Sequence, residues 1–174
     1  MPKVIPNLEK SLIVTAKRLI KTKGYANFTI QQVAKECKIA MGTMYNYFPS
    51  KVHLMGRVIL EDWIIIYKNI ETECENAYTI NQCLKSMYVN LCKFINIYEN
   101  LFKSDTSVND YNVSYINQHK LLAEQLYCLI FKNNERLKSE LDNFTIEFLV
   151  ESIITFSMKD TSYEKMEKIF EKIL

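Results

Sequence analysis

A ten-residue stretch, IAMGTMYNYF at residues 39–48, carries several flat or hydroxyl-bearing side chains close together. The amide of Asn46 can exchange two hydrogen bonds with the edge of an adenine, and the Thr43 methyl group can touch a thymine methyl. The hydroxyl groups of Tyr45 and Tyr47 suit phosphate oxygens. These residue types, at this spacing, favour contact with a nucleic acid.

The chain offers no set of residues typical of an enzyme. Three glycines are too few for a glycine-rich phosphate loop, no G-x-S-x-G occurs, and His53 and His119 are far apart in the sequence. The five cysteines contain no C-x-x-C pair, so we expect free, mostly buried thiols rather than a metal or redox sensor. We therefore expect no catalytic residue, no metal site and no cofactor.

The composition predicts an all-helical globular protein. Apolar residues make up 48% of the 174 residues, and all three prolines and all three glycines lie between Pro2 and Gly56. An all-β fold needs turn residues roughly every 8–12 positions, and the last two thirds of the chain cannot supply them. There is no secretory signal and no apolar run of about 18 residues, so we expect a cytoplasmic protein without a membrane span.

The charges are distributed unevenly along the chain. Residues 1–55 hold nine Lys or Arg against two acidic residues, whereas residues 56–174 hold 13 basic and 18 acidic residues. A basic N-terminal part suits a polyanion, and a mildly acidic remainder indicates a different task. We expect a DNA-binding domain over residues 1–50 and a second helical domain over residues 51–174.

Apolar periodicity and helix-end signals predict eight helices. We expect Asn7 to cap the first helix and Gly24 to end it, and Ser50 to cap the fourth. Capping boxes are expected at Thr29–Gln32 for the second helix and at Thr161–Glu164 for the last. A cap at Asp142 or Asn143 is expected for the seventh helix. The expected helices cover residues 8–23, 30–37, 40–48, 51–74, 79–102, 113–138, 144–158 and 162–173.

The second and third expected helices are short, are joined by about three residues, and lie in the basic head. This arrangement is typical of a helix-turn-helix, in which the second helix lies in the major groove. The run FTIQQVAKECKIAMGTMYNYFPSKVHLM at residues 28–55 resembles the DNA-binding signature of the TetR family of bacterial transcriptional regulators. The matching elements are GY at 24–25, FT at 28–29, VA at 33–34, GTMYNYF at 42–48 and SK..L at 50–54.

The resemblance covers about the first third of the chain and implies roles for single residues. Thr29 and Lys51 would contact phosphates, and Gln31 would reach the groove. The recognition surface would consist of Met41, Gly42, Thr43, Tyr45, Asn46 and Tyr47. Two positions depart from the family pattern: Lys38 stands where a glycine is usual in the turn, and Ala40 stands where a serine usually begins the recognition helix.

The resemblance further implies that a long fourth helix joins the head to a body that binds an effector and dimerises. Aromatic residues with polar ends suit a ligand pocket, although each is equally a candidate for ordinary core. The candidate pocket residues are Trp63, Tyr67, Tyr88, Tyr98, Tyr115, His119 and Tyr127. Apolar residues of the last two helices would form a dimer interface, the alternative being packing onto their own body. These residues are Phe144, Phe148, Ile153, Phe156, Met166 and Phe170.

The sequence thus predicts a transcriptional regulator that binds double-stranded DNA as a homodimer on an inverted repeat. We expect a repressor that a small apolar or aromatic effector releases from its operator. Two alternatives stay open: a DNA-binding protein without an effector, and a helical protein-interaction module whose DNA-binding head is degenerate.

Overall fold

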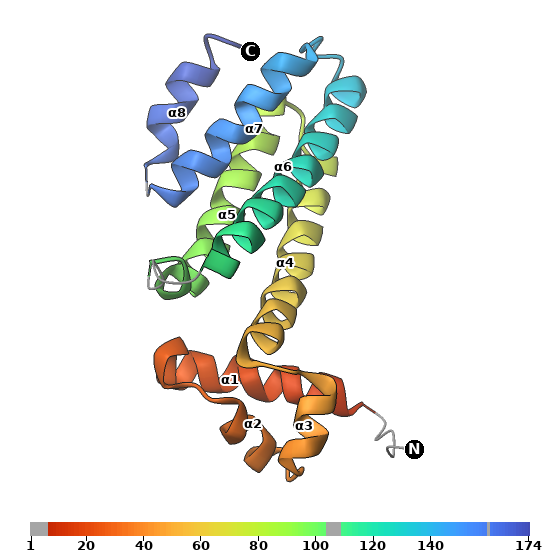
Figure 1. Ribbon diagram of the computed structural model, residues 1–174. Coiled ribbons are helices and arrows are strands. Elements are labelled where there is room, and N and C mark those ends of the chain that lie inside the picture. Colours follow the sequence, from red (N-terminus) through yellow and green to blue (C-terminus); the bar gives the residue numbers. More distant parts are fainter. Residues whose placement is uncertain (1–6, 104–108, 160) are drawn as a thin grey trace. The chain divides into compact units, whose positions relative to one another are not determined.

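A computed structural model of the protein describes residues 7–103, 109–159 and 161–174, with side chains described for 7–98, 120–159 and 161–174. Over the described backbone the chain forms eight α-helices and no strand (Figure 1). The all-α fold expected from the composition is confirmed. The helices are α1 (Leu8–Asn27), α2 (Ile30–Glu36), α3 (Met41–Tyr47), α4 (Lys51–Glu75), α5 (Ile80–Lys103), α6 (Asn109–Leu137), α7 (Asn143–Met158) and α8 (Tyr163–Phe170).

The chain divides into two compact units, Met1–Ile64 and Ile65–Leu174, which we call the head and the body. The division falls inside α4, so the first part of this helix belongs to the head and its last part to the body. The boundary expected after residue 50 would place all of α4 in the second domain. None of the helices in the described part of the chain is long and apolar enough to cross a membrane.

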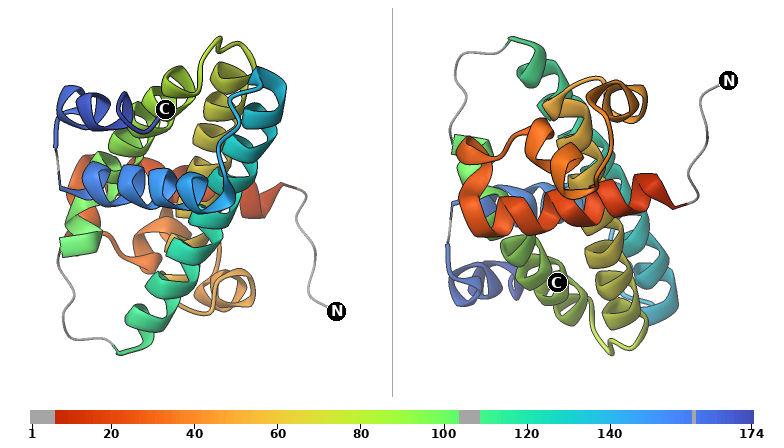
Figure 2. Two further views of the ribbon diagram at one scale, coloured as in Figure 1. Left: turned by 90° about the horizontal axis from the view of Figure 1, so that it is seen from above. Right: turned by 90° about the horizontal axis from the view of Figure 1, so that it is seen from below.

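In the head, α1 packs against α2, and α2 packs against α3 (Figure 2, right). The three helices meet around apolar side chains that are almost completely buried. These side chains are Leu12, Ile13, Ala16, Leu19, Phe28, Val33, Ala34, Met44 and Phe48. The short helices α2 and α3 are therefore held in place by a common core rather than by their own length.

Both ends of α1 differ from the expectation. Asn7 adopts a left-handed conformation (φ 61°, ψ 12°) and its side chain caps nothing, while the Ser11 hydroxyl donates to the Asn7 carbonyl at 3.1 Å. The helix also does not stop at Gly24. Its backbone kinks there, with φ 75° and ψ 161°, and three further helical residues follow up to Asn27. Glycine tolerates this conformation because it has no Cβ atom.

In the body, α5 packs against α6, α7 and α8, and α7 also packs against α6 (Figures 1 and 2). The core is built from the inward stripes of these helices and of the last part of α4. Its members include Ile70, Leu84, Met87, Leu91, Leu126, Ile130, Ile146, Leu149, Ile153, Met166 and Phe170. The apolar stripe of α5 thus lies at the centre of the body.

The body also buries polar side chains, and each is hydrogen-bonded. Asn90 donates to the Glu73 carboxylate at 3.1 Å and to the Ser86 carbonyl at 2.9 Å. Asn133 donates to the Leu129 carbonyl at 2.8 Å. No buried side-chain nitrogen or oxygen within the described residues lacks a partner. Burial of these groups therefore leaves no unpaired donor or acceptor to weaken the fold.

The ends of the body helices confirm some expected caps and correct another. The Asp142 carboxylate accepts from the Thr145 amide at 2.7 Å, and this backbone hydrogen bond lowers the pKa of Asp142. The capping box predicted at Thr161 is wrong, because the residue that precedes α8 is Ser162 and the helix begins at Tyr163. Ser162 caps no amide, and its hydroxyl donates to the Glu164 carboxylate instead. Helix α6 begins at Asn109, four residues before the expected start.

Candidate nucleic-acid interface

Helix α3 separates its buried residues from its polar ones. Met44 is fully buried. Gly42, Tyr45 and Asn46 are exposed and recur at the spacing i, i+3, i+4, which places them on one side of the helix. The Tyr45 side chain is 46% exposed. Met41, Thr43 and Tyr47 are half-buried beside this face. All six residues expected to contact DNA from this helix are therefore at least partly open to solvent.

A capping box fixes the start of α2. The Thr29 hydroxyl accepts from the Gln32 amide at 3.3 Å, and the Gln32 side chain accepts from the Thr29 amide at 3.3 Å. This confirms the cap predicted from the sequence. Gln31, one residue further, is exposed. The Thr29 and Gln32 amides are thus both satisfied by bonds within the capping box. The box fixes the first turn of α2, in which Gln31 lies at the surface.

The turn between α2 and α3 keeps a left-handed residue although it has no glycine. Lys38 has φ 54°, its amide bonds the Lys35 carbonyl at 3.2 Å, and the Ile39 amide bonds the Ala34 carbonyl at 3.0 Å. This pair of bonds is the Schellman pattern, whose left-handed position is usually glycine. Ala40 begins α3 without a side-chain cap, as its lack of a hydroxyl requires.

Lys51, the expected phosphate ligand at the start of α4, is anchored to the end of α1. Its ammonium group donates to the Tyr25 carbonyl at 2.8 Å and lies 4.0 Å from the centre of the Tyr25 ring and 5.5 Å from that of Phe28. Burial lowers the pKa of Lys51. An ammonium group has three donors. One is used here, so the geometry leaves donors for an anion while aromatic rings favour the charge.

Ion pairs join α1 to the part of α4 that belongs to the head. The Lys17 ammonium lies 2.6 Å from the Asp62 carboxylate and 3.3 Å from that of Glu61. Arg57 pairs with Glu9 at 3.3 Å. These contacts neutralise cations on the α1–α4 side. The basic charge of the head is then carried by other lysines.

Two of these lysines were not predicted from the sequence to contact DNA. Lys35 and Lys38 are exposed at the end of α2 and in the turn that precedes α3. They flank the exposed α3 face along the chain and add positive charge beside it. The uneven charge of the sequence was the signal that pointed to such residues, although it could not rank them.

Comparison with known proteins assigns the head to a family. The sequence model described as "Bacterial regulatory proteins, tetR family" matches residues 12–58. The match lies within the head, so it is the N-terminal unit that resembles this family. Residues of the TetR-type head are 51% identical over 47 residues to an uncharacterised HTH-type transcriptional regulator, YuxN, of Bacillus subtilis. They are 36% identical over 52 residues to an uncharacterised HTH-type regulator of Mycobacterium tuberculosis.

These matches cover 27% and 30% of this chain but only 16% and 24% of the length of the two relatives. Similarity over most of the chain is found in solved structures. A TetR-family regulator of Haemophilus influenzae covers 95% of this chain and 93% of its own, with a TM-score of 0.51 and 16% identity. The fatty acid degradation regulator FadR of Bacillus halodurans covers 92% and 89%, with a TM-score of 0.56 and 20% identity. The body therefore shares the fold of TetR-family proteins.

The candidate pocket residues are placed in several environments. Trp63 belongs to the head and is buried. In the body, Tyr88 is buried with its hydroxyl group donating to the Thr161 carbonyl, and the ring of Tyr98 lies edge-on to Phe94 at 5.4 Å. Tyr67 is half-buried, and burial followed by the charge of Glu71 raises its pKa.

Three further pocket candidates lie on α6. The Tyr127 ring stacks on Phe131 at 6.1 Å. Tyr115 and His119 fall within residues 99–119, whose side chains lie outside the described part.

A cavity of about 400 Å³ occurs elsewhere in the body, at the turn between α4 and α5. Its lining includes none of the candidates and is formed mainly by Glu73, Asn76, Tyr78, Gln82, Lys85 and Val89. The pocket assignment stays a prediction.

The candidate dimer residues form a buried group and an exposed group, and Phe156 is half-buried. Ile153, Met166 and Phe170 are almost fully buried inside the body. Phe144 and Phe148 on α7 are 77% and 47% exposed. The periodicity of these helices could not separate the two groups, because both lie on strongly apolar stretches. Of these candidates, the exposed Phe144 and Phe148 offer the most surface to a second chain.

Proposed function

We propose that the protein is a DNA-binding transcriptional regulator that reads the major groove with α3. The observation that carries this proposal is the exposed face of Gly42, Tyr45 and Asn46 on a helix whose opposite residue, Met44, is fully buried. In a helix-turn-helix the second helix enters the major groove with such a face. The family match over residues 12–58 supports the same role.

Each residue of the interface has a distinct task in this proposal. Asn46 pairs with a base edge, and Gly42 lets the backbone of α3 approach the DNA closely. Thr29 and Lys51 bind phosphates on either side of the groove, where Lys51 is already oriented by the Tyr25 carbonyl. Gln31 and the remaining α3 residues, Met41, Thr43, Tyr45 and Tyr47, complete the contact.

The regulator binds an inverted repeat as a homodimer in this proposal. One chain carries one reading helix, and two-fold related half-sites of a helix-turn-helix dimer lie about 34–36 Å apart. The exposed phenylalanines of α7, Phe144 and Phe148, supply an apolar surface for the second copy. Large exposed apolar side chains on neighbouring turns are a common mark of protein contacts.

We further propose that the regulator is a repressor released by a small apolar or aromatic molecule bound in the body. The aromatic residues Tyr67, Tyr88, Tyr98 and Tyr127 offer rings with polar ends for such a molecule. Helix α4 belongs to both units, so a ligand that shifts it in the body acts on an element of the head. Release requires that the ligand bind the DNA-free state more tightly.

The DNA-binding proposal is tested by selecting bound sequences from a library of random duplex DNA. A regulator should enrich an inverted repeat, bind it as a dimer, and lose affinity steeply as salt rises, because phosphate contacts release counterions. Failure to enrich any sequence would favour the interaction module with a degenerate head. A footprint of one half-site by a monomer would contradict the dimer.

Two substitutions in the head should then have different kinds of effect on DNA binding. Asn46→Ala should relax the preference at one base position by about 1–3 kcal/mol, because a bidentate contact is lost. Lys51→Ala should weaken binding to all sites alike and reduce the salt slope by about one unit. Fluorescence anisotropy on the selected site and its single-base variants measures both effects.

Lys68→Ala is the matched control, because Lys68 is an exposed lysine in the body part of α4. It should leave both affinity and salt slope unchanged. If Asn46→Ala weakens every site by the same factor, Asn46 does not read a base.

The effector proposal is tested by screening small apolar and aromatic compounds for a rise in melting temperature. A compound that stabilises the protein is then titrated into the complex with the selected DNA. Coupling of typical size should lower DNA affinity about 5- to 150-fold. Stabilising compounds that leave DNA affinity unchanged would favour the DNA-binding protein without an effector. A reporter gene behind the selected site distinguishes a repressor from an activator.

A further inference from the structure

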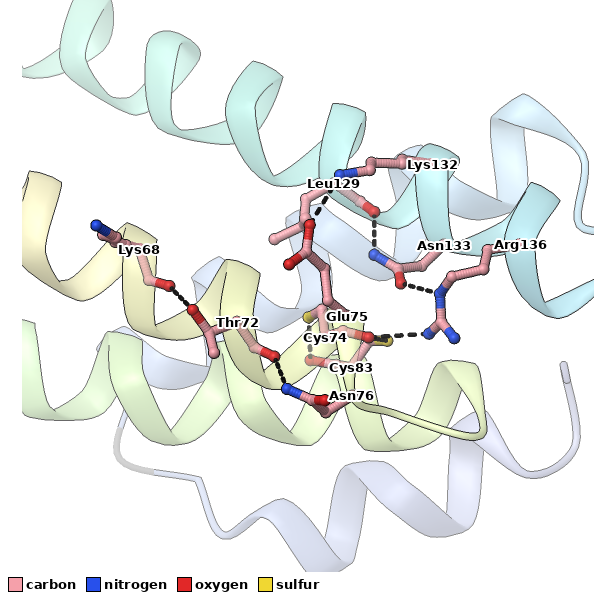
Figure 3. A network of polar contacts seen from close by, with 10 residues as sticks. All are labelled: Lys68, Thr72, Cys74, Glu75, Asn76, Cys83, Leu129, Lys132, Asn133 and Arg136. Atoms are coloured by element: carbon pink, nitrogen blue, oxygen red, sulfur yellow. Dashed lines mark hydrogen bonds and ion pairs between the residues drawn. The ribbon is translucent and has the colours of Figure 1, made fainter.

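Two buried cysteines face each other where α4 ends and α5 begins. Cys74 and Cys83 are both fully buried, and each sulfur lies 3.8 Å from the carbonyl oxygen of the other residue. Each thiol thus donates to the backbone carbonyl of the other cysteine. Figure 3 shows the pair between the two helices. Their spacing of nine residues gave no sign of this contact in the sequence.

A cation from a third helix lies beside the pair. The Arg136 guanidinium on α6 donates to the Cys74 carbonyl at 2.9 Å (Figure 3). It also donates to the Ala77 carbonyl at 2.8 Å. Asn133 accepts from the same guanidinium at 3.0 Å and thereby orients it. A positive charge is thus held beside the cysteine pair by one carbonyl of the last turn of α4 and one carbonyl of the turn that follows.

This surrounding makes the two thiols unequal. The neighbouring Cys83 side chain raises the pKa of Cys74, and burial raises it further, while the charge of Arg136 opposes both. The Cys74 side chain and the charge of Arg136 lower the pKa of Cys83 against the opposing effect of burial. A thiolate is the reactive form of cysteine, and a thiol in contact with it can resolve an oxidised sulfur. In the reaction proposed below Cys83 attacks and Cys74 resolves, and the opposite order gives the same disulfide.

We propose that Cys74 and Cys83 form a redox-active dithiol that a peroxide converts to a disulfide joining α4 to α5. The Cys83 sulfur attacks one peroxide oxygen, the O–O bond breaks, and a sulfenic acid and one water form. The Cys74 thiol then loses its proton, and its sulfur displaces the hydroxyl group from Cys83 as a second water. The two sulfurs together lose two electrons, and one hydrogen peroxide is reduced to two waters.

The turn beside the pair offers a route for so small an oxidant. The cavity of about 400 Å³ is lined by residues that adjoin both cysteines in the chain, Glu73 before Cys74 and Gln82 before Cys83. Exposed Tyr78 forms part of the same wall. Local opening of this short turn admits peroxide without unfolding of the body. The resulting bond would fix the last turn of α4 to the first turn of α5, and this inference does not depend on the function proposed above.

The test uses the full chain with Cys37→Ser, Cys92→Ser and Cys128→Ser, so that only the buried pair remains. The folded protein is treated with hydrogen peroxide, unreacted thiols are alkylated after denaturation, and the intact mass is measured. The expected product has lost two hydrogens, contains no alkylated thiol, and returns to the dithiol with dithiothreitol. Closure of this loop should raise the melting temperature by roughly 5 °C.

Cys83→Ala in the same background is the matched control, because alanine keeps an apolar side chain at the buried position. It should gain oxygen or stay reduced and show no rise in melting temperature. Peptide mapping of the peroxide-treated natural sequence must find the Cys74–Cys83 link without any substitution. The proposal is overturned if both thiols stay fully alkylatable, if they gain oxygen without a link, or if only links between chains form.

Discussion

The head and the body place their polar side chains in opposite positions. In the described part of the chain, the five buried polar residues, Ser86, Asn90, Asn133, Asn134 and Ser157, all belong to the body. The head keeps its polar side chains at the surface, where Asn46 and Tyr45 form the candidate interface. The head therefore presents polar groups to a partner, whereas the body uses them to fix its own packing.

The two units also differ in the range of the bonds that shape them. In the head, the bonds that fix the start of α2 and the turn before α3 link residues three to five positions apart, as in the Thr29 capping box and the turn at Lys38. In the body, Arg136 reaches carbonyls about sixty positions away, and the Tyr163 hydroxyl donates to the Asn81 carbonyl 82 positions away. Local bonds thus fix the helix-turn-helix of the head on its common core, whereas long-range bonds hold the turns of the body in place.

The strongest test of this comparison is a truncation in the body core. Leu91→Ala on α5 removes a side chain that is 1% exposed, and we expect the free energy of unfolding to fall by about 2–5 kcal/mol because a cavity is left behind. Urea denaturation followed by circular dichroism measures the change. Val89→Ala, at a side chain that is 38% exposed on the same helix, should change it by less than about 0.5 kcal/mol. Equal effects would show that packing does not govern the body.

The same difference decided what the sequence could predict. The caps at Thr29, Ser50 and Asp142 were predicted correctly, because each depends on residues within one turn: the His53 amide, for example, bonds the Ser50 hydroxyl at 3.3 Å. The sequence correctly predicted a break of the helix at Gly24, but it did not predict the three helical residues that follow. These residues lead to Phe28, whose buried side chain belongs to the core of the head. The cap predicted at Asn7 was wrong, because this residue adopts a left-handed backbone conformation and its side chain caps no amide.

Long-range features were out of reach of the sequence. Apolar periodicity placed Ile153 and Phe148 on the same helix, yet one is buried and the other is half exposed. Only the packing of α7 on α5 and α6 distinguishes them. The contact between Cys74 and Cys83 likewise depends on how the turn after α4 folds back. The roles of the DNA-binding residues stay predictions, because they concern a partner.

A second test asks whether backbone conformation governs the head. Gly24→Ala should destabilise the protein by about 1–3 kcal/mol, because φ 75° with ψ 161° is a region essentially restricted to glycine. No atom lies within 4 Å of the added Cβ, so the cost comes from the backbone alone. Gly56→Ala is the control: it lies inside α4 with equally open space, and it should stabilise the protein by up to about 1 kcal/mol. Thermal unfolding of both variants should shift in opposite directions.

A third test compares two helix starts. Thr29→Ala removes the hydroxyl that accepts from the Gln32 amide, and we expect a loss of about 1 kcal/mol. Ser162→Ala at the start of α8 removes a hydroxyl that caps no amide, so the change should stay within about 0.5 kcal/mol. Chemical denaturation of the two variants under one set of conditions is sufficient. A larger loss for Ser162→Ala would mean that the body also depends on local caps.

The smallest expected effects concern two lysines of the head that differ in their partners. Burial lowers the pKa of Lys17, but the hydrogen bonds and charges of Asp62 and Glu61 outweigh it, so the pKa is raised above 10.5. Lys51 has a carbonyl and aromatic rings but no carboxylate, and burial lowers its pKa below 10.5. Folding thus favours the proton on Lys17 and disfavours it on Lys51.

The two lysines should therefore give opposite dependences on pH. The stability from Lys17 is complete below its unfolded pKa of 10.5 and is lost as the pH rises through its higher folded value. For Lys51 the unfolded chain binds more protons, so the wild type should gain stability between the lowered folded pKa and 10.5. The stability advantage of wild type over Lys17→Met should be at most about 1 kcal/mol at neutral pH and should shrink above pH 10.5. The advantage over Lys51→Met should instead grow as the pH approaches 10.5. Denaturation curves from neutral to alkaline pH measure both differences, and equal slopes would show that the carboxylates of α4 do not hold the Lys17 charge.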